Sequence, residues 1–237
     1  MQLVDLKIEN RIARLTFQRP GGNAFSTEML TQFRAALERA STEAGILLIR
    51  AAGEDFSLGR DRQEPKPSGT PFDAFKLITE VNAALTAFPG VAVALAQGRA
   101  FGFAVGLIMR CDIAIASEDA RFALDEVKLG ISPMFIMAEI LEHLSPKRAL
   151  DIVLSSREFG AAEAREMGLV SRVVPAARLE ASGEELVREL SSRDPAVLVA
   201  SKRYLGEVRQ LPPAARAAYA LVEQTRFGEQ HSRRTKV

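Results

Sequence analysis

One stretch of small residues, GRAFGFAVGLIMRCD at residues 98–112, combines features of a helix entry with those of an anion-binding turn. Its glycines Gly98, Gly102 and Gly106 recur every four residues and lead into an apolar helix. Glycine destabilises a helix interior, so this spacing needs a reason. Main-chain amides at the start of a helix attract negative charge, whereas a helix face without side chains lets a neighbouring backbone come close. The stretch therefore predicts either an anion-binding turn or a close helix contact.

A dinucleotide-binding turn is one form of the first interpretation. Such a turn follows the first strand of its domain, whereas this stretch lies far along the chain. The tyrosine that precedes a lysine by four residues in short-chain dehydrogenases is also missing, because Val208 follows Tyr204 and Glu223 follows Tyr219 at that spacing. The sequence therefore argues against a nicotinamide enzyme.

Histidine and cysteine do not form a catalytic or metal-binding pattern in this sequence. His143 and His231 have no serine or cysteine partner in a nucleophile turn, so no catalytic triad is expected. Cys111 is the only cysteine, which argues against a zinc site and excludes an internal disulfide. Cys111 lies in an apolar run, where a small core residue is the simplest interpretation.

The composition is that of a globular protein with a sizeable core. The chain has 237 residues, of which 47% are hydrophobic and 26% charged, with a formal net charge of +1. This balance provides no overall field to attract nucleic acid or an anionic membrane. Residues 1–10 lack a signal-peptide pattern, and no apolar stretch approaches the ~20 residues that span a bilayer. We therefore expect a cytoplasmic protein with no nucleic-acid or membrane partner.

The pattern around the glycine-rich stretch predicts strands that alternate with helices. Residues 3–17 alternate apolar and polar on both sides of a turn, which predicts a hairpin. Ser26 is the expected N-cap of a helix that stops at Gly45. Buried strands are expected at 46–52, 90–97, 111–117 and 169–175, and helices at 71–88 and over most of the chain after Pro133. The fold class is therefore α/β with a helical C-terminal part.

The order of these motifs resembles the crotonase family, the enoyl-CoA hydratase/isomerase superfamily. GGNAFSTEMLTQFRAAL at 21–37 resembles its N-terminal helix entry, and GEDFSLGRD at 53–61 resembles its FSAGAD loop. Residues 90–133 resemble the block from G…ALGGG.ELAL.CD through F..PE..LG..P, and residues 148–175 resemble the later helix-turn-strand segment. The likeness is colinear from about Leu3 to Pro175.

This resemblance implies the crotonase-like (ClpP/crotonase) α/β fold, a spiral of ββα units. Residues 1–175 would form the core with a CoA-thioester site. Residues 176–237 would form a helical region of the same structural unit that joins copies of the chain. The expected assembly is a homotrimer or a homohexamer.

The resemblance also implies a site that stabilises an enolate of a CoA thioester. Two main-chain N–H groups grip the thioester oxygen in this family. Matched residue by residue, they are the amides of Arg60, just after Gly59, and Phe103, just after Gly102. The same matching places substrate or CoA beside Ala24, Phe25, Leu58, Gly59, Asp61, Gly102 and Met134.

Two glutamates act together in hydratases of the family, and this sequence matches one of them. Glu126, in ALDEVKLG, matches the retained carboxylate, whereas Gly106 stands at the position of the second. A pair of carboxylates suits the addition of water, but one base suffices to move a double bond. The resemblance therefore favours isomerase chemistry. A hydratase with an atypical second group, or a catalytically weak acyl-CoA-binding scaffold, stays open. Without the resemblance, Glu126 would be interpreted as a solvated carboxylate beside a strand.

Coenzyme A would enter as part of the substrate, with no permanently bound cofactor and no metal. Two interpretations stay open for the basic residues of the long loop, Arg60, Arg62 and Lys66: contacts with the CoA phosphates, or ordinary surface charge.

Bulky residues follow Pro133 where the family usually has GAGGT. Met134, Phe135 and Met137 are expected to narrow or reshape the acyl pocket. Met134 also stands where the dienoyl isomerases of the family have an aspartate, which disfavours that reaction. Glu139, on the helix that follows, is expected at the surface.

Overall fold

A six-stranded sheet forms the centre of the computed structural model, which describes residues 1–64 and 71–234. β1 (Val4–Glu9) and β2 (Ile12–Phe17) form the predicted antiparallel hairpin. Asn10 and Arg11 in its turn both have positive φ, as a type I′ turn requires. The remaining strands run parallel to β2 in the order β3 (Ile46–Ala51), β4 (Val91–Ala96), β6 (Ile113–Ser117) and β9 (Arg172–Val174).

A second sheet of three short strands lies after the carboxyl ends of the first. It consists of β5 (Arg99–Phe101), β7 (Arg121–Ala123) and β8 (Phe159–Gly160), none of which the sequence pattern predicted. β4 leads through β5 into helix α3 (Phe103–Arg110), and β6 leads through β7 into the 3-10 helix η1 (Glu126–Leu129). The chain therefore repeats a unit of a long strand, a short strand and a helix. The short strands β5 and β7 place the starts of α3 and η1 in the same region.

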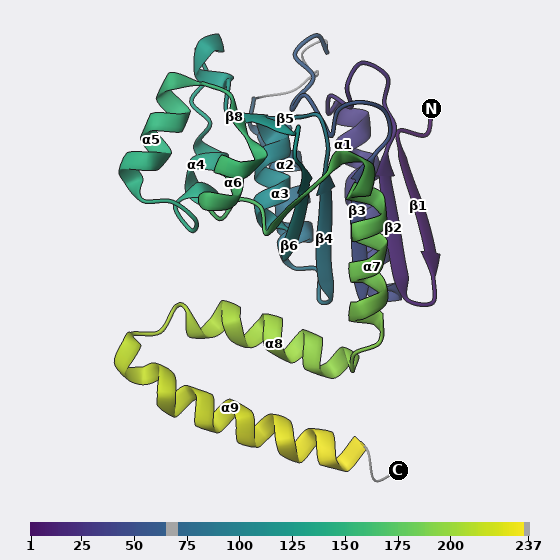
Figure 1. The fold of residues 1–237 in the computed structure, drawn as a ribbon, viewed down its shortest axis with the longest axis vertical. Helices are drawn as coiled ribbons and strands as arrows, with labels where there is room; N and C mark the ends of the chain where they lie inside the picture. Colours follow the sequence, from purple (N-terminus) through teal and green to yellow (C-terminus); the bar gives the residue numbers. More distant parts are fainter. Residues whose placement is uncertain (65–70, 235–237) are drawn as a thin grey trace. The chain divides into compact units, whose positions relative to one another are not determined.

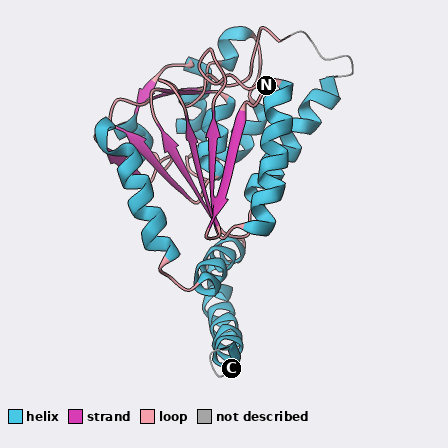
Figure 2. Cartoon of the chain, turned by 90° about the vertical axis from the view of Figure 1, so that its right-hand side faces the viewer, coloured by secondary structure: helices cyan, strands magenta, loops and turns pink. Residues whose placement is uncertain are grey.

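Helices lie on both sides of the six-stranded sheet (Figures 1 and 2). α1 (Thr27–Glu43) and α2 (Pro71–Thr86) pack against each other, and Ser26 caps α1 as predicted by accepting a hydrogen bond from the Met29 amide. The smaller elements are α4 (Met134–Ile140), α5 (Pro146–Ser155), α6 (Ala161–Glu166) and the 3-10 helix η2 (Ala176–Arg178). Within the described ranges, no helix has the length and apolar character needed to cross a bilayer.

The first compact unit spans Met1–Ser191, so its boundary differs from the one predicted after residue 175. The reason is α7 (Leu179–Ser191), which packs on β3, β4 and β6. A Cβ atom on Gly183 would lie 2.6 Å from Leu95 Cδ1, so the helix backbone approaches the sheet more closely than any side chain would allow.

The second unit comprises residues 192–237, of which 192–234 are described, and is a hairpin of two helices. α8 (Pro195–Val208) and α9 (Pro213–Arg234) contact each other through the rings of Tyr204 and Tyr219, which stack with their centroids 5.7 Å apart. Several apolar side chains of this hairpin are exposed: Val197, Val199, Leu205, Leu221 and Val222.

The core of the first unit contains a cluster of phenylalanines under the N-terminal loops. The Phe17 ring meets the rings of Phe25, Phe33 and Phe56 edge-on, with centroids 4.9, 5.1 and 5.8 Å away. All four side chains are fully buried. Because Phe25 and Phe56 belong to the segments at residues 23–27 and 55–61, the cluster anchors both segments to the core.

We expect Phe17→Ala to lower the free energy of unfolding by about 3–5 kcal/mol, because it leaves a cavity in contact with three other rings. Urea unfolding followed by circular dichroism measures the loss. Phe72→Ala is the matched control, since Phe72 is 71% exposed. Equal losses in the two variants would contradict the cluster's structural role.

Candidate active site

Glu126 lies at the start of η1, in the turn that follows β7. Its side chain is largely buried, and its Oε2 atom has no hydrogen-bond partner in the described part of the chain. Burial raises the pKa of Glu126; the nearby Asp125 carboxylate adds to this increase, whereas its own amide and the Arg62 cation oppose it. The structure therefore holds a carboxylate with raised proton affinity, the property expected of a general base that works near neutral pH.

Gly102 is the residue against which this carboxylate lies. A Cβ atom on Gly102 would lie 2.5 Å from Glu126 Oε1, so any side chain there would displace the carboxylate. Gly102 also has φ 52° and ψ −119°, a conformation open in practice only to glycine. It is the N-cap of α3, so the amide of Phe103 is the first of the helix.

The loop at residues 57–61 brings a second main-chain amide to the same place. Phe25 donates a hydrogen bond to the Gly59 carbonyl and accepts one from the Asp61 amide, at 2.7 and 2.9 Å. Because neighbouring peptide groups of an extended segment point to opposite sides, the intervening Arg60 amide faces away from Phe25. A Cβ atom on Gly59 would lie only 2.8 Å from the Phe101 carbonyl oxygen and 3.6 Å from Phe103 N. The absence of a side chain on Gly59 therefore allows the two segments to meet.

The amides of Arg60 and Phe103 share one further property. Within residues 1–64 and 71–234, neither donates a hydrogen bond to a main-chain carbonyl. Both therefore remain available to an oxygen atom of a ligand, and the second also carries the positive end of the α3 dipole.

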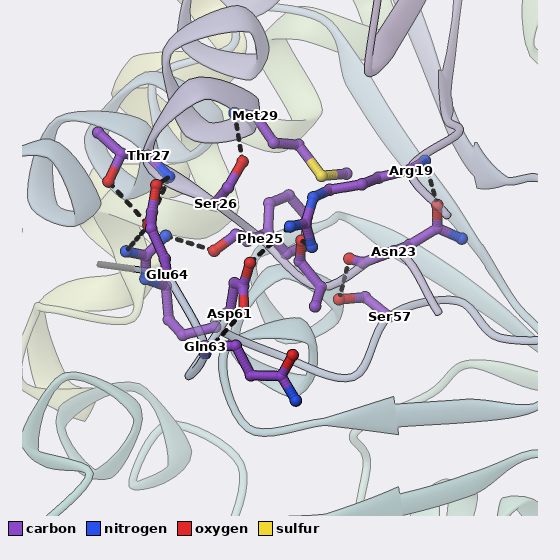
Figure 3. Close-up of polar contacts among 12 residues, drawn as sticks. Arg19, Asn23, Phe25, Ser26, Thr27, Met29, Ser57, Asp61, Gln63 and Glu64 are labelled. Atoms are coloured by element: carbon purple, nitrogen blue, oxygen red, sulfur yellow. Dashed lines mark hydrogen bonds and ion pairs between the residues drawn. The ribbon is translucent and has the colours of Figure 1, made fainter. Parts of the chain in front are cut away.

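A polar network holds the loop at residues 57–64 against the start of α1 (Figure 3). Asn23 accepts a hydrogen bond from the Ser57 hydroxyl, and Arg19 forms an ion pair with Asp61 at 2.5 Å. Glu64 accepts hydrogen bonds from the Thr27 amide and hydroxyl. Asp61 thus anchors the loop. Burial acts to raise its pKa, but hydrogen bonds from the Gln63 amide and Arg19 outweigh burial and lower the pKa.

The remaining residues predicted to meet the substrate lie in three different environments. Phe25 is fully buried and its ring meets that of Phe103, while the carbonyl of Ala24 accepts a hydrogen bond from Arg19. The Leu58 side chain lies over Gly22, where a Cβ atom would come within 2.6 Å of it. Met134 is 72% exposed at the start of α4.

Gly106, the position expected to lack a second glutamate, is covered by an arginine. The Arg110 guanidinium donates to the Gly106 carbonyl at 2.8 Å, and its Nη1 atom lies 3.1 Å from where a Gly106 Cβ would be. Glu139 of α4, expected at the surface, instead pairs with Arg110 at 3.0 Å, and the arginine side chain is only 9% exposed. Burial lowers the pKa of Arg110, against the opposing effect of Glu139. Sequence reasoning missed this pair, although Arg110 follows Gly106 by one helical turn and so shares its face.

The basic residues of the long loop are engaged in internal contacts. Arg60 donates to the Phe25 carbonyl and pairs with Glu64, and Arg62 pairs with Asp125 at 2.7 Å. Lys66 lies outside the described residues. The interpretation of Arg60 as a free cation for a phosphate is therefore not supported by its contacts.

Known proteins resemble this chain over nearly its whole length. The family model described as Enoyl-CoA hydratase/isomerase matches residues 7–235. Hydroxycinnamoyl-CoA hydratase-lyase of Pseudomonas fluorescens is 29% identical over 88% of this chain and 79% of its own. 2,3-Dehydroadipyl-CoA hydratase of Escherichia coli is 28% identical over 86% and 81%. A Thermobifida fusca protein whose crystal structure was solved in complex with CoA has a TM-score of 0.85 and 29% identity, over 97% of this chain and 95% of that one.

Glu126→Gln is expected to stabilise the folded protein, and only at pH values above the ordinary glutamate pKa of 4.5. Because the pKa of Glu126 is raised by folding above its ordinary value of 4.5, the wild-type protein loses stability as the pH rises through the folded pKa. Glutamine carries no charge to desolvate, so the variant avoids this loss. Below the ordinary value both proteins should have equal stability.

Urea unfolding over a pH series tests this expectation, with the exposed Glu118→Gln as a control. A stability difference that is absent at alkaline pH, or that grows on acidification, would show that Glu126 is not a desolvated carboxylate.

Proposed function

Because this chain belongs to the enoyl-CoA hydratase/isomerase family and has its crotonase fold, we propose that it moves a double bond in an enoyl-CoA thioester. The thioester oxygen would accept hydrogen bonds from the amides of Arg60 and Phe103, and Glu126 would carry the proton. The observation that supports this most directly is the meeting of Gly59, Phe103, Gly102 and Glu126 in one place.

The two amides would lower the energy of the enolate as it forms. Main-chain donors that are fixed before the reaction stabilise developing negative charge without having to reorient. The Phe103 amide adds the favourable field of a helix N-terminus. Both donors belong to the main chain, so the side chains of Arg60 and Phe103 are free to serve the fold instead.

Glu126 would act as base and then as acid. Its carboxylate removes a proton from carbon 2 of a 3-enoyl thioester, and the electron pair of that C–H bond enters a dienolate whose charge lies on the thioester oxygen. The protonated Glu126 then returns the proton to carbon 4, so the double bond ends between carbons 2 and 3. One carboxylate suffices, and the proton balance closes without water.

Hydration is the second candidate. The names of two relatives support it, because both are called hydratases. In this chain Glu139 is the carboxylate near Gly106, and it pairs with Arg110, the arginine that covers that glycine. In this structure Glu139 is held in an ion pair with Arg110 at 3.0 Å, so it is not a free second carboxylate beside Gly106. Isomerisation therefore comes first.

A cavity beside Leu58 suits the coenzyme part of the substrate. Its volume is about 630 Å³, and it is lined by residues 18–23 and 52–55 together with Leu58 and Arg99. Leu58 is two residues from the Arg60 amide, so a CoA arm in this cavity would reach the thioester site along the same loop. We include CoA binding here in the proposal, with no permanently bound cofactor.

The proposal also includes an assembly of several copies in the cytoplasm. The exposed apolar side chains of the α8–α9 hairpin are the surface that other copies would cover in a homotrimer or homohexamer. Size-exclusion chromatography with light scattering measures the assembly.

The purified protein is expected to convert a 3-enoyl-CoA to its 2-enoyl isomer, and Glu126→Gln is expected to lower that rate by at least about 10²- to 10⁴-fold. The rise in ultraviolet absorbance of the conjugated thioester measures the reaction. Glu118→Gln is the control and should keep wild-type activity. Equal rates in wild type and Glu126→Gln would refute the role of Glu126, and CoA binding without turnover of any enoyl chain would favour a scaffold.

Gly106→Glu is expected to add some hydration of crotonyl-CoA, and more when Arg110 is also removed. In the single variant the new carboxylate would pair with the Arg110 guanidinium, only 3.1 Å from the new Cβ. Gly106→Glu/Arg110→Leu frees it, and we expect at least about tenfold more hydration than in the single variant. Arg110→Leu alone is the control. A well-folded double variant with no hydration would show that Gly106 does not face the substrate.

A further inference from the structure

The turn that carries Glu126 has few anchors of its own. In η1, Lys128 and Leu129 are exposed and Glu126 and Val127 are only partly so, and of these four residues Val127 alone packs against the hydrophobic core. For residues 125–131, within the described chain, the one side-chain hydrogen bond runs from Arg62 to Asp125, at 2.7 Å. Asp125 is the residue immediately before Glu126.

The loop that carries Arg62 is, by contrast, firmly held. Ser57, Asp61 and Glu64 each bond to the segment at residues 19–27, as Figure 3 shows. The Arg60 side chain adds a hydrogen bond to Phe25. Arg62 therefore extends from a fixed platform toward a weakly anchored turn.

We propose that Arg62 is a positioning residue, whose ion pair with Asp125 holds the Glu126 turn in register with the Arg60 amide. This inference rests on the proposed function, in which the amide and the carboxylate act on neighbouring atoms of one thioester. Arg62 lies two residues after Arg60, and Asp125 lies one residue before Glu126. This ion pair thus links the two halves of the site across more than sixty residues of chain.

Arg62 and Asp125 shift the pKa of Glu126 in opposite directions. The Asp125 carboxylate raises the pKa of Glu126, and the Arg62 cation lowers it. Helix α3 packs against Glu126 at Gly102. Its charged side chain, Arg110, is paired with Glu139 beside Gly106. Asp125 and Arg62 are therefore the charged groups that act on Glu126 in the described structure.

The pair contributes to geometry more than to stability. The side chains of Arg62 and Asp125 are 41% and 22% exposed, and ion pairs of this kind add little to the free energy of folding. A shift of the carboxylate by about 1 Å relative to the bound thioester, however, costs up to about 10²-fold in rate.

The experiment compares Arg62→Gln, Asp125→Asn, the double variant, and the charge-reversed pair Arg62→Asp/Asp125→Arg. Arg178→Gln is the matched control, because Arg178 forms an exposed ion pair with Glu185 at 2.9 Å in the same unit. Enoyl-CoA isomerisation gives kcat and KM. Carbon-13 NMR of glutamate-labelled protein follows the titration of Glu126, whose signal is identified by its absence in Glu126→Gln.

We expect each single variant to lower kcat roughly tenfold with little change in KM, and the double variant to be no worse than either single one. The charge-reversed pair should recover most of the lost kcat. The pKa of Glu126 should rise in Arg62→Gln and fall in Asp125→Asn. Recovery of kcat in the charge-reversed pair is the result that two independent charges beside Glu126 would not give.

Unchanged kcat in both single variants, additive losses in the double variant, or pKa changes of the same sign would overturn the inference. The NMR titration needs no turnover. If the wild-type protein is inactive on every enoyl-CoA, the proposed function fails, and the titration alone then decides whether Arg62 and Asp125 control Glu126.

Discussion

The site depends on how closely two glycine main chains approach their neighbours. Gly59 brings its loop against Phe101 and Phe103, and Gly102 lets the Glu126 carboxylate lie on the first turn of α3. Both glycines have positive φ, so the backbone path and the lack of a side chain are required together. The glycine spacing of residues 98–112 is thus explained at Gly102 by a turn and at Gly106 by contact with Arg110 and Ile136.

This arrangement carries a cost that the rest of the fold offsets. A buried carboxylate whose Oε2 atom has no hydrogen-bond partner among the described residues destabilises the folded state when it is charged. The phenylalanine cluster around Phe17 and the polar network at residues 19–27 and 57–64 stabilise the surrounding loops. A stable platform under a desolvated carboxylate is the usual compromise between stability and activity.

In the proposed mechanism, the pair of Arg110 and Glu139 occupies the place where a hydratase would need a second free carboxylate. The guanidinium fills the space over Gly106, and α4 supplies its counter-charge. The site therefore has one free carboxylate and one neutralised cation along the same face of α3. That distribution of charge suits a reaction in which one group carries the proton both ways.

Local patterns in the sequence were sufficient for the hairpin at residues 4–17, the capped helix from Thr27 and the buried strands, because alternation, capping and short apolar runs act over a few residues. The order of the motifs was sufficient for the family, because it extends over most of the chain. Site residues Glu126, Gly102 and Gly59 were candidates from that order alone. Only the tertiary structure decided the three-residue strands, which are too short to show a period, and the end of the first unit at Ser191. It also decided which charges pair, since Arg62 with Asp125 and Arg110 with Glu139 meet only after the chain has folded.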